Sequence, residues 1–333
     1  MPEPTLAILD VGHGNCAILS DDKVAVIDAG PGTALLEFLA REGIKRVHVV
    51  LISHADEDHI KGLVSLIESQ NVTLDLIRIN SDSLKGSPTW NDLIFVLDEA
   101  NKTGKLRFEV GLTTNDSDRF NTASIRIEIL APSPGLAVKG PGSEDHRGRK
   151  LTSNSNSVVV RLVRDGTSHV ILPGDIDETG LQNLLESGQD LRASVAVFPH
   201  HGGGAASSDL PRFAAEFSRA TGAESLIFSI GRGRYDTPKP EVVDAARRQL
   251  PKVRILCTQL SEHCASQLPK LDPTHLTGKF SRGLETRRCC SGTIVLTLAP
   301  TRDNVLPLVD KHLRFISESA PSALCTKPLA GQK

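Results

Sequence analysis

The sequence predicts a layered α/β sandwich, with sheets inside and helices outside. Short, β-branched apolar runs alternate with helical patterns through most of the 333 residues. These runs form two series, one ending near residue 54 and the other beginning near residue 124. The composition, with 39% hydrophobic residues and a net charge of −2, is typical of a globular protein with a buried core. We therefore expect two sheet-forming halves.

The first half combines four strand patterns with three helical ones. Its strand patterns are "TLAILDV", "CAIL", "KVAVIDAG" and "RVHVVLISH". The last two are nearly continuous apolar runs, as strands buried on both faces are. Helical patterns, with apolar residues on one face, lie at about 33–43, 59–70 and 89–103.

The second half combines six strand patterns with three helical ones. Its strand patterns are "SIRIEIL", "SVVVRLV", "HVILPGD", "VAVFPHHG", "LIFSIG" and "KVRILC". Helical patterns at about 177–187, 208–221 and 239–249 separate the later strands. The alternation of the two kinds of pattern predicts a second sheet with its own helices.

Three segments depart from this alternation. Residues 132–156 are rich in Pro, Gly, Ser and charge, which predicts a long mobile loop near the functional edge. Residues 258–291 carry clustered cysteines and precede a last strand, "GTIVLTL". The chain from residue 301 contains one helical pattern, "PLVDKHLRFISES", beyond which we expect it to fray. We thus expect one domain over 1–300, with an insertion at about 258–291, and a tail over 301–333.

Composition limits the setting in which the protein works. A net charge of −2 excludes a histone-like basic surface, so any nucleic-acid contact requires local clusters of basic residues. We find no N-terminal signal pattern and no apolar run long enough to cross a bilayer, and we expect a cytoplasmic protein without membrane contact. In that compartment the six cysteines are expected to be thiols or metal ligands before disulfides.

The stretch "LISHADEDHIKGL", residues 51–63, concentrates chemistry directly after a buried strand. Other acidic and histidine residues also follow predicted strands. Because α/β folds place their chemistry at the carboxyl ends of strands, these residues are expected to converge. The residues of this set are His54, Asp56, Asp58 and His59 in the stretch, and Asp28, Asp175, His200 and His201 elsewhere.

Two simpler interpretations of the stretch are weaker. A single Asp or His in such a loop is usually solvated, or caps the helix that follows. The recurrence of these residues at several strand ends argues against that interpretation here. A calcium loop would need a Gly and a distal Glu at offsets where this sequence has neither.

His and Asp side chains together predict a site for divalent transition metals. Carboxylate ligands favour hard ions such as Mn²⁺, and Zn²⁺ also suits the set. Two ions bridged by one carboxylate would neutralise the cluster. They would also lower the pKa of a shared water enough to give hydroxide near neutral pH.

The motif "HADEDH" resembles the metal signature of the metallo-β-lactamase-fold hydrolases. It has the H-x-D-x-D-H form found in the nuclease-like domain of bacterial DNA-uptake proteins, the ComEC/Rec2 group. The resemblance runs from about residue 5 to 298 and includes "LDVGHGNCAIL", "VAVIDAG", "NSNSVVVRL", "VILPGDID", "VAVFPHHGG" and "LIFSIGRGRYDTPKP". It implies a four-layer αββα sandwich that holds two divalent ions, Zn or Mn. The membrane-spanning parts of the uptake proteins are missing, so we expect a free-standing soluble relative.

The resemblance also implies a role for each residue of the motif. His54 and Asp56 would help to bind one ion, and Asp58 and His59 would bind the other. Asp175 would bridge the two ions. Asp58 would also orient the nucleophilic water or accept its proton. Asp58, His59 and Asp175 are therefore the expected catalytic residues.

The remaining implied roles are less direct. One residue of the "HH" pair, His201 rather than His200, would complete the ligands, and Asp28 would brace the loop that presents them. Two positions depart from the family's pattern. Asn154 and Asn156 stand where many such enzymes have a metal-binding His, and "YDTPKP" stands where the uptake domains have a His-Pro. Each departure removes a nitrogen donor, so one ion is expected to be weakly held or recruited with substrate.

Two groups near strand ends can contact phosphate. Gly202 and Gly203 can let backbone N–H groups approach a phosphate, or they can form a flexible turn. Arg232, Arg234 and Tyr235 can contact phosphates and stack on a base, or they can form a solvated basic turn. The sequence leaves both alternatives open.

Four cysteines in and beside the insertion have the donor type of a structural zinc site. They are Cys257, Cys264, Cys289 and Cys290. An insertion with few large apolar residues needs such a cross-link to stabilise its fold. However, the spacing C-x₆-C…C-C is not that of a standard zinc knuckle, and ordinary buried thiols are the equal alternative.

These observations predict a metal-dependent hydrolase. The uptake-type signature favours a phosphodiesterase or nuclease that acts on DNA or RNA through hydroxide activated by two metal ions. One alternative is a hydrolase of lactones, thioesters or cyclic nucleotides. The other is a catalytically weak binding or regulatory subunit that works with a protein partner in an operon-encoded system.

Overall fold

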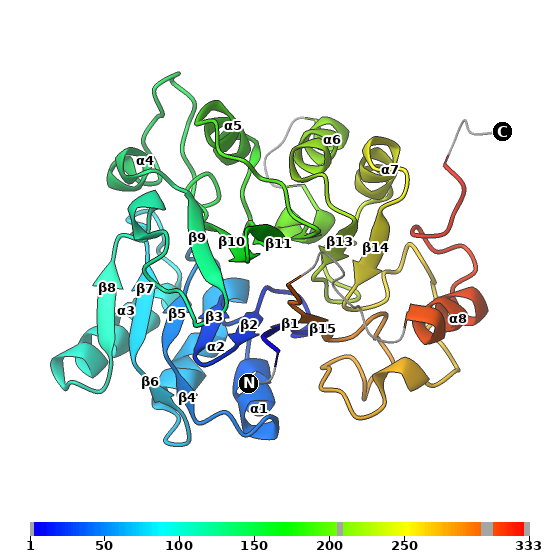
Figure 1. The fold of residues 1–333 in the computed structure, drawn as a ribbon, viewed down its shortest axis with the longest axis horizontal. Coiled ribbons are helices and arrows are strands. Elements are labelled where there is room, and N and C mark those ends of the chain that lie inside the picture. Colours follow the sequence, from blue (N-terminus) through cyan, green and yellow to red (C-terminus); the bar gives the residue numbers. More distant parts are fainter. Residues whose placement is uncertain (1–2, 205–208, 301–308, 330–333) are drawn as a thin grey trace.

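The computed structural model of the chain describes residues 3–204, 209–300 and 309–329. Two sheets face each other, and a layer of helices covers the outer face of each (Figure 1). The arrangement confirms the predicted αββα sandwich.

The first sheet has seven strands in the order β15-β1-β2-β3-β5-β7-β8. The strands from β15 to β3 pair antiparallel, and those from β3 to β8 pair parallel. Its strands are β1 (Thr5–Ile8), β2 (Ala17–Ser20), β3 (Val24–Ile27), β5 (Val49–Leu51), β7 (Leu76–Ile79), β8 (Arg107–Val110) and β15 (Ile294–Thr297). A short separate ladder joins β4 (Arg46–Val47) and β6 (Thr73–Leu74). The helices that cover this sheet are α1 (Ala34–Arg41), α2 (Glu57–Glu68) and α3 (Pro88–Lys102).

The second sheet has six strands in the order β14-β13-β12-β11-β10-β9. Strands β11 to β14 run parallel, so their carboxyl ends meet at one edge. Its strands are β9 (Arg126–Ala131), β10 (Val159–Arg164), β11 (Thr167–Leu172), β12 (Val195–Val197), β13 (Ser225–Phe228) and β14 (Arg254–Cys257). The helices that cover this sheet are α5 (Glu178–Glu186), α6 (Leu210–Thr221) and α7 (Pro240–Gln249).

Three buried apolar clusters fill the spaces between these four layers. The middle cluster joins the inner faces of both sheets, with Leu6 and Leu51 from the first and Val160 from the second. The outer clusters join each sheet to its own helices. Because strand side chains alternate in direction, Val159 packs against the helices while its neighbour Val160 packs between the sheets. The near-continuous apolar runs of the sequence serve both interfaces.

The structure differs from the sequence predictions in two regions of the chain. Strands β7 and β8 were not predicted, because "LIRI" and "RFEV" carry charges that mask the strand pattern. Residues 132–156 are not a plain loop, since they contain α4 (Pro134–Lys139) and a bridge between Glu144 and Lys150. Arg149 ties this segment to α5 through Glu186, 3.1 Å away.

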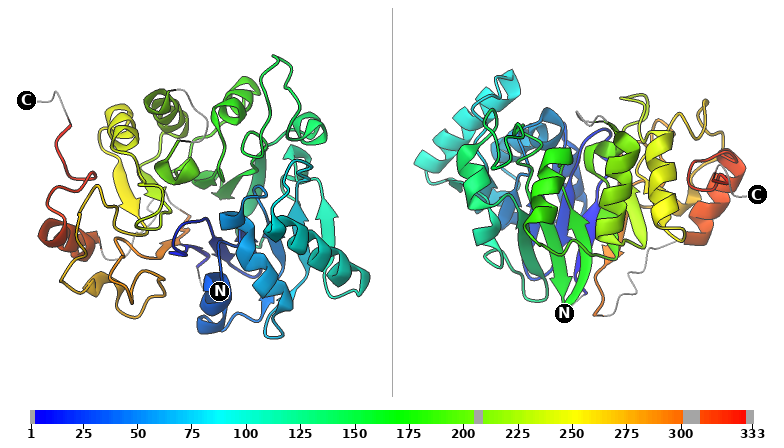
Figure 2. Two further views of the ribbon diagram at one scale, coloured as in Figure 1. Left: turned by 180° about the vertical axis from the view of Figure 1, so that it is seen from behind. Right: turned by 90° about the horizontal axis from the view of Figure 1, so that it is seen from above.

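The C-terminal part of the chain packs on the second half. Helix α8 (Val309–Ser319) lies beside the insertion (Figure 2). Its residues Phe315 and Ile316 enter the same apolar cluster as α6 and α7, and Leu324 follows them. Residues 320–329 thus pack on the core where fraying was expected. Within the described residues, no helix combines the length and the apolar character that crossing a membrane requires.

Candidate metal centre

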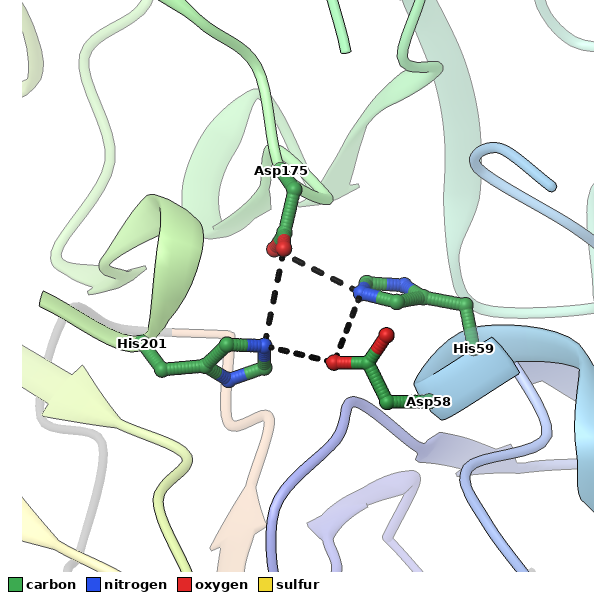
Figure 3. Close-up of side chains that lie close together, drawn as sticks. All are labelled: Asp58, His59, Asp175 and His201. Carbon is green, nitrogen blue, oxygen red and sulfur yellow. Dashed lines mark hydrogen bonds and ion pairs between the residues drawn. The ribbon is translucent and has the colours of Figure 1, made fainter. Parts of the chain in front are cut away.

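Four side chains converge at the edge where β5, β11 and β12 end (Figure 3). Asp58 and His59 lie in the first turn of α2, Asp175 follows β11, and His201 lies in the turn after β12. One donor atom from each lies within 4.8 Å of the other three. The Nε2 atom of His201 is 3.1 Å from Asp58 Oδ2 and 3.5 Å from Asp175 Oδ2. The Nε2 atom of His59 is 3.4 Å from Asp175 Oδ1.

Hydrogen bonds fix the rings of both histidines so that Nε2 faces the centre. The Nδ1–H group of His59 donates to Asp28 Oδ2 at 2.8 Å. Asp28 in turn accepts bonds from the backbone N–H and the hydroxyl of Ser53, at 2.7 and 2.8 Å. The Nδ1–H group of His201 donates to the carbonyl of Ser229 at 2.5 Å. Such partners set the tautomer and orientation of metal-binding histidines. The bonds from Ser53 also join Asp28 to the loop that it was predicted to brace.

Charge in the centre is balanced by protons on the histidines. Burial alone would lower the pKa of His201, but the carboxylates of Asp175 and Asp58 raise it to about 10. Burial likewise opposes a charge on His59, and the carboxylates around it nonetheless raise its pKa. Although burial disfavours their charged forms, Asp58 and Asp175 have lowered pKa values beside these rings. Two imidazolium rings thus face two carboxylates.

The residues of this centre fit a divalent metal ion. Two imidazole nitrogens and two carboxylate oxygens suit Zn²⁺ and Mn²⁺. An ion bound by both rings would replace their two Nε2 protons and leave the charge of the centre unchanged. The alternative in which Asp56 or Asp58 merely caps α2 is wrong for Asp56, the residue at the cap position, because its side chain makes no cap hydrogen bond.

His54 and Asp56 lie beside the centre rather than in it. The ring of His54 packs on that of His59, with centroids 4.1 Å apart, and its Nε2 atom is buried without a hydrogen-bond partner. Burial lowers the pKa of His54 to about 4, so the ring is neutral. Asp56 Oδ2 is 3.8 Å from His54 Nε2, while Asp56 Oδ1 accepts a bond from the ammonium of Lys85.

Of the paired histidines, His201 joins the centre and His200 supports it. The backbone N–H of His200 donates to Asp175 Oδ1 at 3.2 Å, and its ring Nδ1 lies 3.5 Å from Asp175 Oδ2. Both histidines have left-handed backbone, with φ of 52° and 57°, which few non-glycine residues adopt. Such conformations cluster at functional sites.

Asn156 lies in the segment that packs against the loop carrying the motif. Its side chain is buried, and neither atom of its amide has a hydrogen-bond partner. Two bonds hold this segment in place: the N–H of Val158 donates to the carbonyl of Ser53, and the N–H of Asp175 donates to the Ser157 hydroxyl. Asn154 Oδ1 is also buried without a partner.

Two residues at the centre, His13 and Asn15, were not predicted from the sequence. His13 Nε2 lies 3.6 Å from Asp58 Oδ2, and its ring centroid lies 4.1 Å from that of His201. The Asn15 amide donates to Asp175 Oδ1 at 3.2 Å. The signal that could have identified them is the "GHGN" turn that follows β1, in which both glycines have positive φ.

The predicted phosphate contacts divide into exposed and buried residues. Arg234 and Tyr235 are exposed, and the ring of Tyr235 lies 4.6 Å from that of His13. Arg232 is buried and donates to the carbonyls of Leu260, Ala265 and Ser266, so its predicted phosphate contact is wrong. The glycines after His201 serve packing. A Cβ on Gly202 would meet Phe228 and Pro238 at 2.6 Å.

The four cysteines predicted to bind zinc do not meet at one site. Cys289 Sγ instead contacts the Ser281 hydroxyl at 3.0 Å and Asp10 Oδ2 at 3.5 Å. Cys257, Cys264 and Cys290 line a small apolar cavity with Cys325. Within residues 3–204, 209–300 and 309–329, no group of three or more close metal donors includes a cysteine. The thiols fit the alternative interpretation, since burial raises the pKa of Cys257, Cys264, Cys289 and Cys290.

The fold and this centre define a known class of protein. A model of the "Metallo-beta-lactamase superfamily" matches residues 9–206, more than half of the chain. The chain therefore belongs to this superfamily of hydrolases, as the sequence predicted.

Individual relatives share parts of the chain. It is 25% identical over 225 residues to ComE operon protein 3 of Bacillus subtilis (strain 168), covering 67% of this chain and 25% of that protein. It is 22% identical over 266 residues to competence protein ComA of Neisseria gonorrhoeae, covering 78% of this chain and 31% of that protein. The chain thus spans less than a third of the length of either relative.

Solved structures of the fold are similar at lower identity. The metallo-beta-lactamase fold protein YhfI of Bacillus subtilis is 12% identical, with a TM-score of 0.48, covering 77% of this chain and 97% of that one. Igni18, a metallo hydrolase from Ignicoccus hospitalis KIN4/I, is 15% identical, with a TM-score of 0.42, covering 75% and 94%.

Proposed function

We propose that this chain is a metal-dependent phosphodiesterase that cleaves nucleic acid. The observation that carries the proposal is a row of rings from the centre to the surface. His201 contacts His13, His13 contacts Tyr235, and the guanidinium of Arg234 lies 5.7 Å from the Tyr235 ring centroid. The row joins a residue suited to stacking and a residue suited to phosphate directly to the metal donors.

Exposure and backbone geometry support a binding role for Tyr235. Its side chain is 65% exposed, and it is the one tyrosine of the chain. Tyr235 and Asp236 both have φ of 55°, a conformation that costs a non-glycine residue energy and recurs at functional sites. A nucleobase stacked on Tyr235 would bring its phosphate toward His13 and the centre. The resemblance to the DNA-uptake domains points to the same substrate class.

The residues of the centre suit hydrolysis of a phosphodiester. A divalent ion held by Asp58, His59, Asp175 and His201 would lower the pKa of a water and act as a Lewis acid toward the phosphodiester. The Asp58 carboxylate orients the attacking water or accepts its proton. Burial lowers the pKa of His13 to about 4, so its neutral ring can donate a hydrogen bond to an oxygen of the substrate. Asn15 and His200 hold the Asp175 carboxylate in place.

A matched pair of assays tests the function. The chain is incubated with Mn²⁺ or Zn²⁺ and with single-stranded DNA, double-stranded DNA, RNA or bis-p-nitrophenyl phosphate. Tyr235→Ala should raise KM for the nucleic acid by about tenfold, because a stacked base contributes about 1–3 kcal/mol. It should leave hydrolysis of the small diester nearly unchanged. The proposal would be refuted if the chain cleaved lactones or thioesters and left the nucleic acids uncleaved.

A small-molecule hydrolase is the second candidate. It is favoured by the net charge of −2, which offers a polyanion little long-range attraction. The salt dependence of binding separates the candidates, because contacts with a phosphate backbone give a steep slope. If the chain cleaves neither class of substrate, the third candidate function gains support, that of a regulatory subunit that works with a protein partner.

A further inference from the structure

The pocket formed by His54 and Asp56 differs in kind from the four-residue centre. Among the described residues, Asp58, His59, Asp175 and His201 make the only group of three or more close metal donors of the His, Cys, Asp or Glu types. The His54–Asp56 pocket therefore has two such donors, with Nε2 of His54 3.8 Å from Oδ2 of Asp56. A second ion would have few ligands there.

A cation from the chain already pairs with this pocket. The ammonium of Lys85 forms an ion pair with Asp56 Oδ1. The side chains of both residues are partly buried, with 25% of Lys85 and 33% of Asp56 exposed. A pair shielded to this degree is screened less by salt than a surface pair is.

The loop that carries Lys85 is fastened to the site. Asp82 is buried in this loop and accepts bonds from the N–H groups of Leu84 and Lys85, through its carboxylate and its carbonyl respectively. Its other carboxylate oxygen accepts a bond from the hydroxyl of Ser153, in the segment that bears Asn156. Lys85 is thus joined to the motif through Asp56 and, by way of Asp82, to the segment that carries Ser153.

The charges make Lys85 and a second ion alternatives. The single positive charge of Lys85 balances the carboxylate of Asp56, just as an ion in this pocket would. A divalent cation placed there would lose much of the attraction of Asp56 and would be repelled by the ammonium. It could bind only if Lys85 moved out.

We propose that Lys85 takes the place of the second metal ion of this centre. The chain then holds one divalent ion tightly, in the pocket of Asp58, His59, Asp175 and His201. Lys85 supplies the second positive charge, where it can face an anionic group of the substrate. Only this last point rests on the proposed function, because the number of bound ions does not depend on the substrate.

The number of bound ions tests the proposal without any assay of turnover. Metal-free protein is titrated with Mn²⁺ by calorimetry, and ions retained after gel filtration are counted by elemental analysis. The wild-type chain should hold one ion per chain. Lys85→Met should gain a second site that binds Mn²⁺ at least about tenfold more tightly than any second site of the wild type, a difference of about 1.4 kcal/mol.

Two controls separate charge from other effects. Lys85→Arg keeps the positive charge and should hold one ion. Lys61→Met removes an exposed lysine from α2, five residues after Asp56 in the chain, and should also hold one ion. Two tight ions in the wild-type chain would overturn the proposal, and so would a Lys85→Met variant that folds and still binds one. Neither result would contradict the proposed cleavage of nucleic acid. In the same way, a protein that does not cleave nucleic acid could still bind one ion per chain.

Discussion

At the scale of the residue, the centre depends on a few atoms whose surroundings set their charge. The carboxylate of Asp58 lies close to two histidines. Its Oδ2 atom is 3.1 Å from His201 Nε2 and 3.6 Å from His13 Nε2. It is also partly exposed in the first turn of α2. Its removal therefore changes the chemistry without opening a cavity.

We expect Asp58→Ala to reduce hydrolysis at least ~10²-fold, as removal of a metal-holding or electrostatic group commonly does. Thermal unfolding should show a folded protein, with a loss of stability no larger than that of the ion pairs of Asp58 with His201 and His59. Asn154→Ala, outside the four-residue centre, should have a milder effect on turnover. Turnover by the Asp58 variant at the wild-type rate, with metal in excess, would show that hydrolysis occurs elsewhere.

We expect metal affinity to rise with pH. The pKa values of His59 and His201 are raised in the metal-free protein, that of His201 to about 10, so an ion must displace two protons. At pH values below the folded pKa of both rings, the association constant should therefore increase by up to two decades per pH unit. Calorimetry in buffers of different ionisation enthalpy counts the protons released, and an affinity independent of pH would contradict the charge assignment.

The same shifts set the stability of the metal-free protein. A histidine with a raised pKa contributes stability that is complete below its unfolded value of about 6.5 and is lost as pH rises through the folded pKa. The lowered pKa values of Asp58 and Asp175 contribute stability that is complete above about 3.8 and is lost as pH falls. Both contributions from the centre are thus complete between about pH 4 and 6.5.

At the scale of the element, the turn after β12 positions His201 through its packing. Gly202 follows His201 with φ of 76°, and Phe228 of β13 and Pro238 lie against its Cα. This turn could not be derived from the sequence, where the run of glycines fits equally a phosphate loop. The three-dimensional neighbours of Gly202 decide between the two.

We expect Gly202→Ala to destabilise the chain more than Gly166→Ala does. Gly166 also has φ of 76°, but a Cβ there would meet no atom within 4 Å. The control should show only the conformational cost, about 1 kcal/mol, while Gly202→Ala adds overpacking of about 1–3 kcal/mol. Chemical denaturation measures both, and equal losses would contradict the packing role.

The insertion is held by charged hydrogen bonds. Asp10, fully buried, accepts bonds from Gln259 Nε2 at 2.8 Å, the N–H of Gly283 at 2.9 Å and the hydroxyl of Ser281. Arg232 binds three further carbonyls of the insertion. The sequence suggested that cysteines hold this segment, because residue types that can bind a metal are visible in a sequence. The contact of Asp10 with Gln259, 249 residues further along the chain, is not.

We expect Asp10→Asn to destabilise the protein by about 2–3 kcal/mol, since it weakens several buried bonds to a charged acceptor. Limited proteolysis should then cut first within 258–291. Cys289→Ser, which keeps a polar atom near Asp10 and Ser281, should cost less and should not change the metal content. Release of zinc from that variant would restore the zinc hypothesis.

At the scale of the whole molecule, prediction succeeded where each element carries its own pattern. The six helices that cover the two sheets and most strands have apolar spacing that identifies them, and residue type in the motif after β5 indicates Asp58 and His59, which lie in the four-residue centre. Strands β7 and β8 failed the same test because Arg78 is buried within a network with Glu109 and Asp116. For His13, the "GHGN" turn marks the residue in the sequence, but only the fold brings its ring to that of His201.

One consequence concerns how the two halves cooperate in folding. Asp58 and His59 belong to the first half of the sandwich, and Asp175 and His201 belong to the second. An ion held by all four would be a cross-link between the halves, available only to the folded state. At a hundredfold excess over its Kd, such a ligand adds about 2.7 kcal/mol to the free energy of unfolding. The melting temperature would then rise with the free concentration of the ion, and the chain would be most stable in cells rich in that metal.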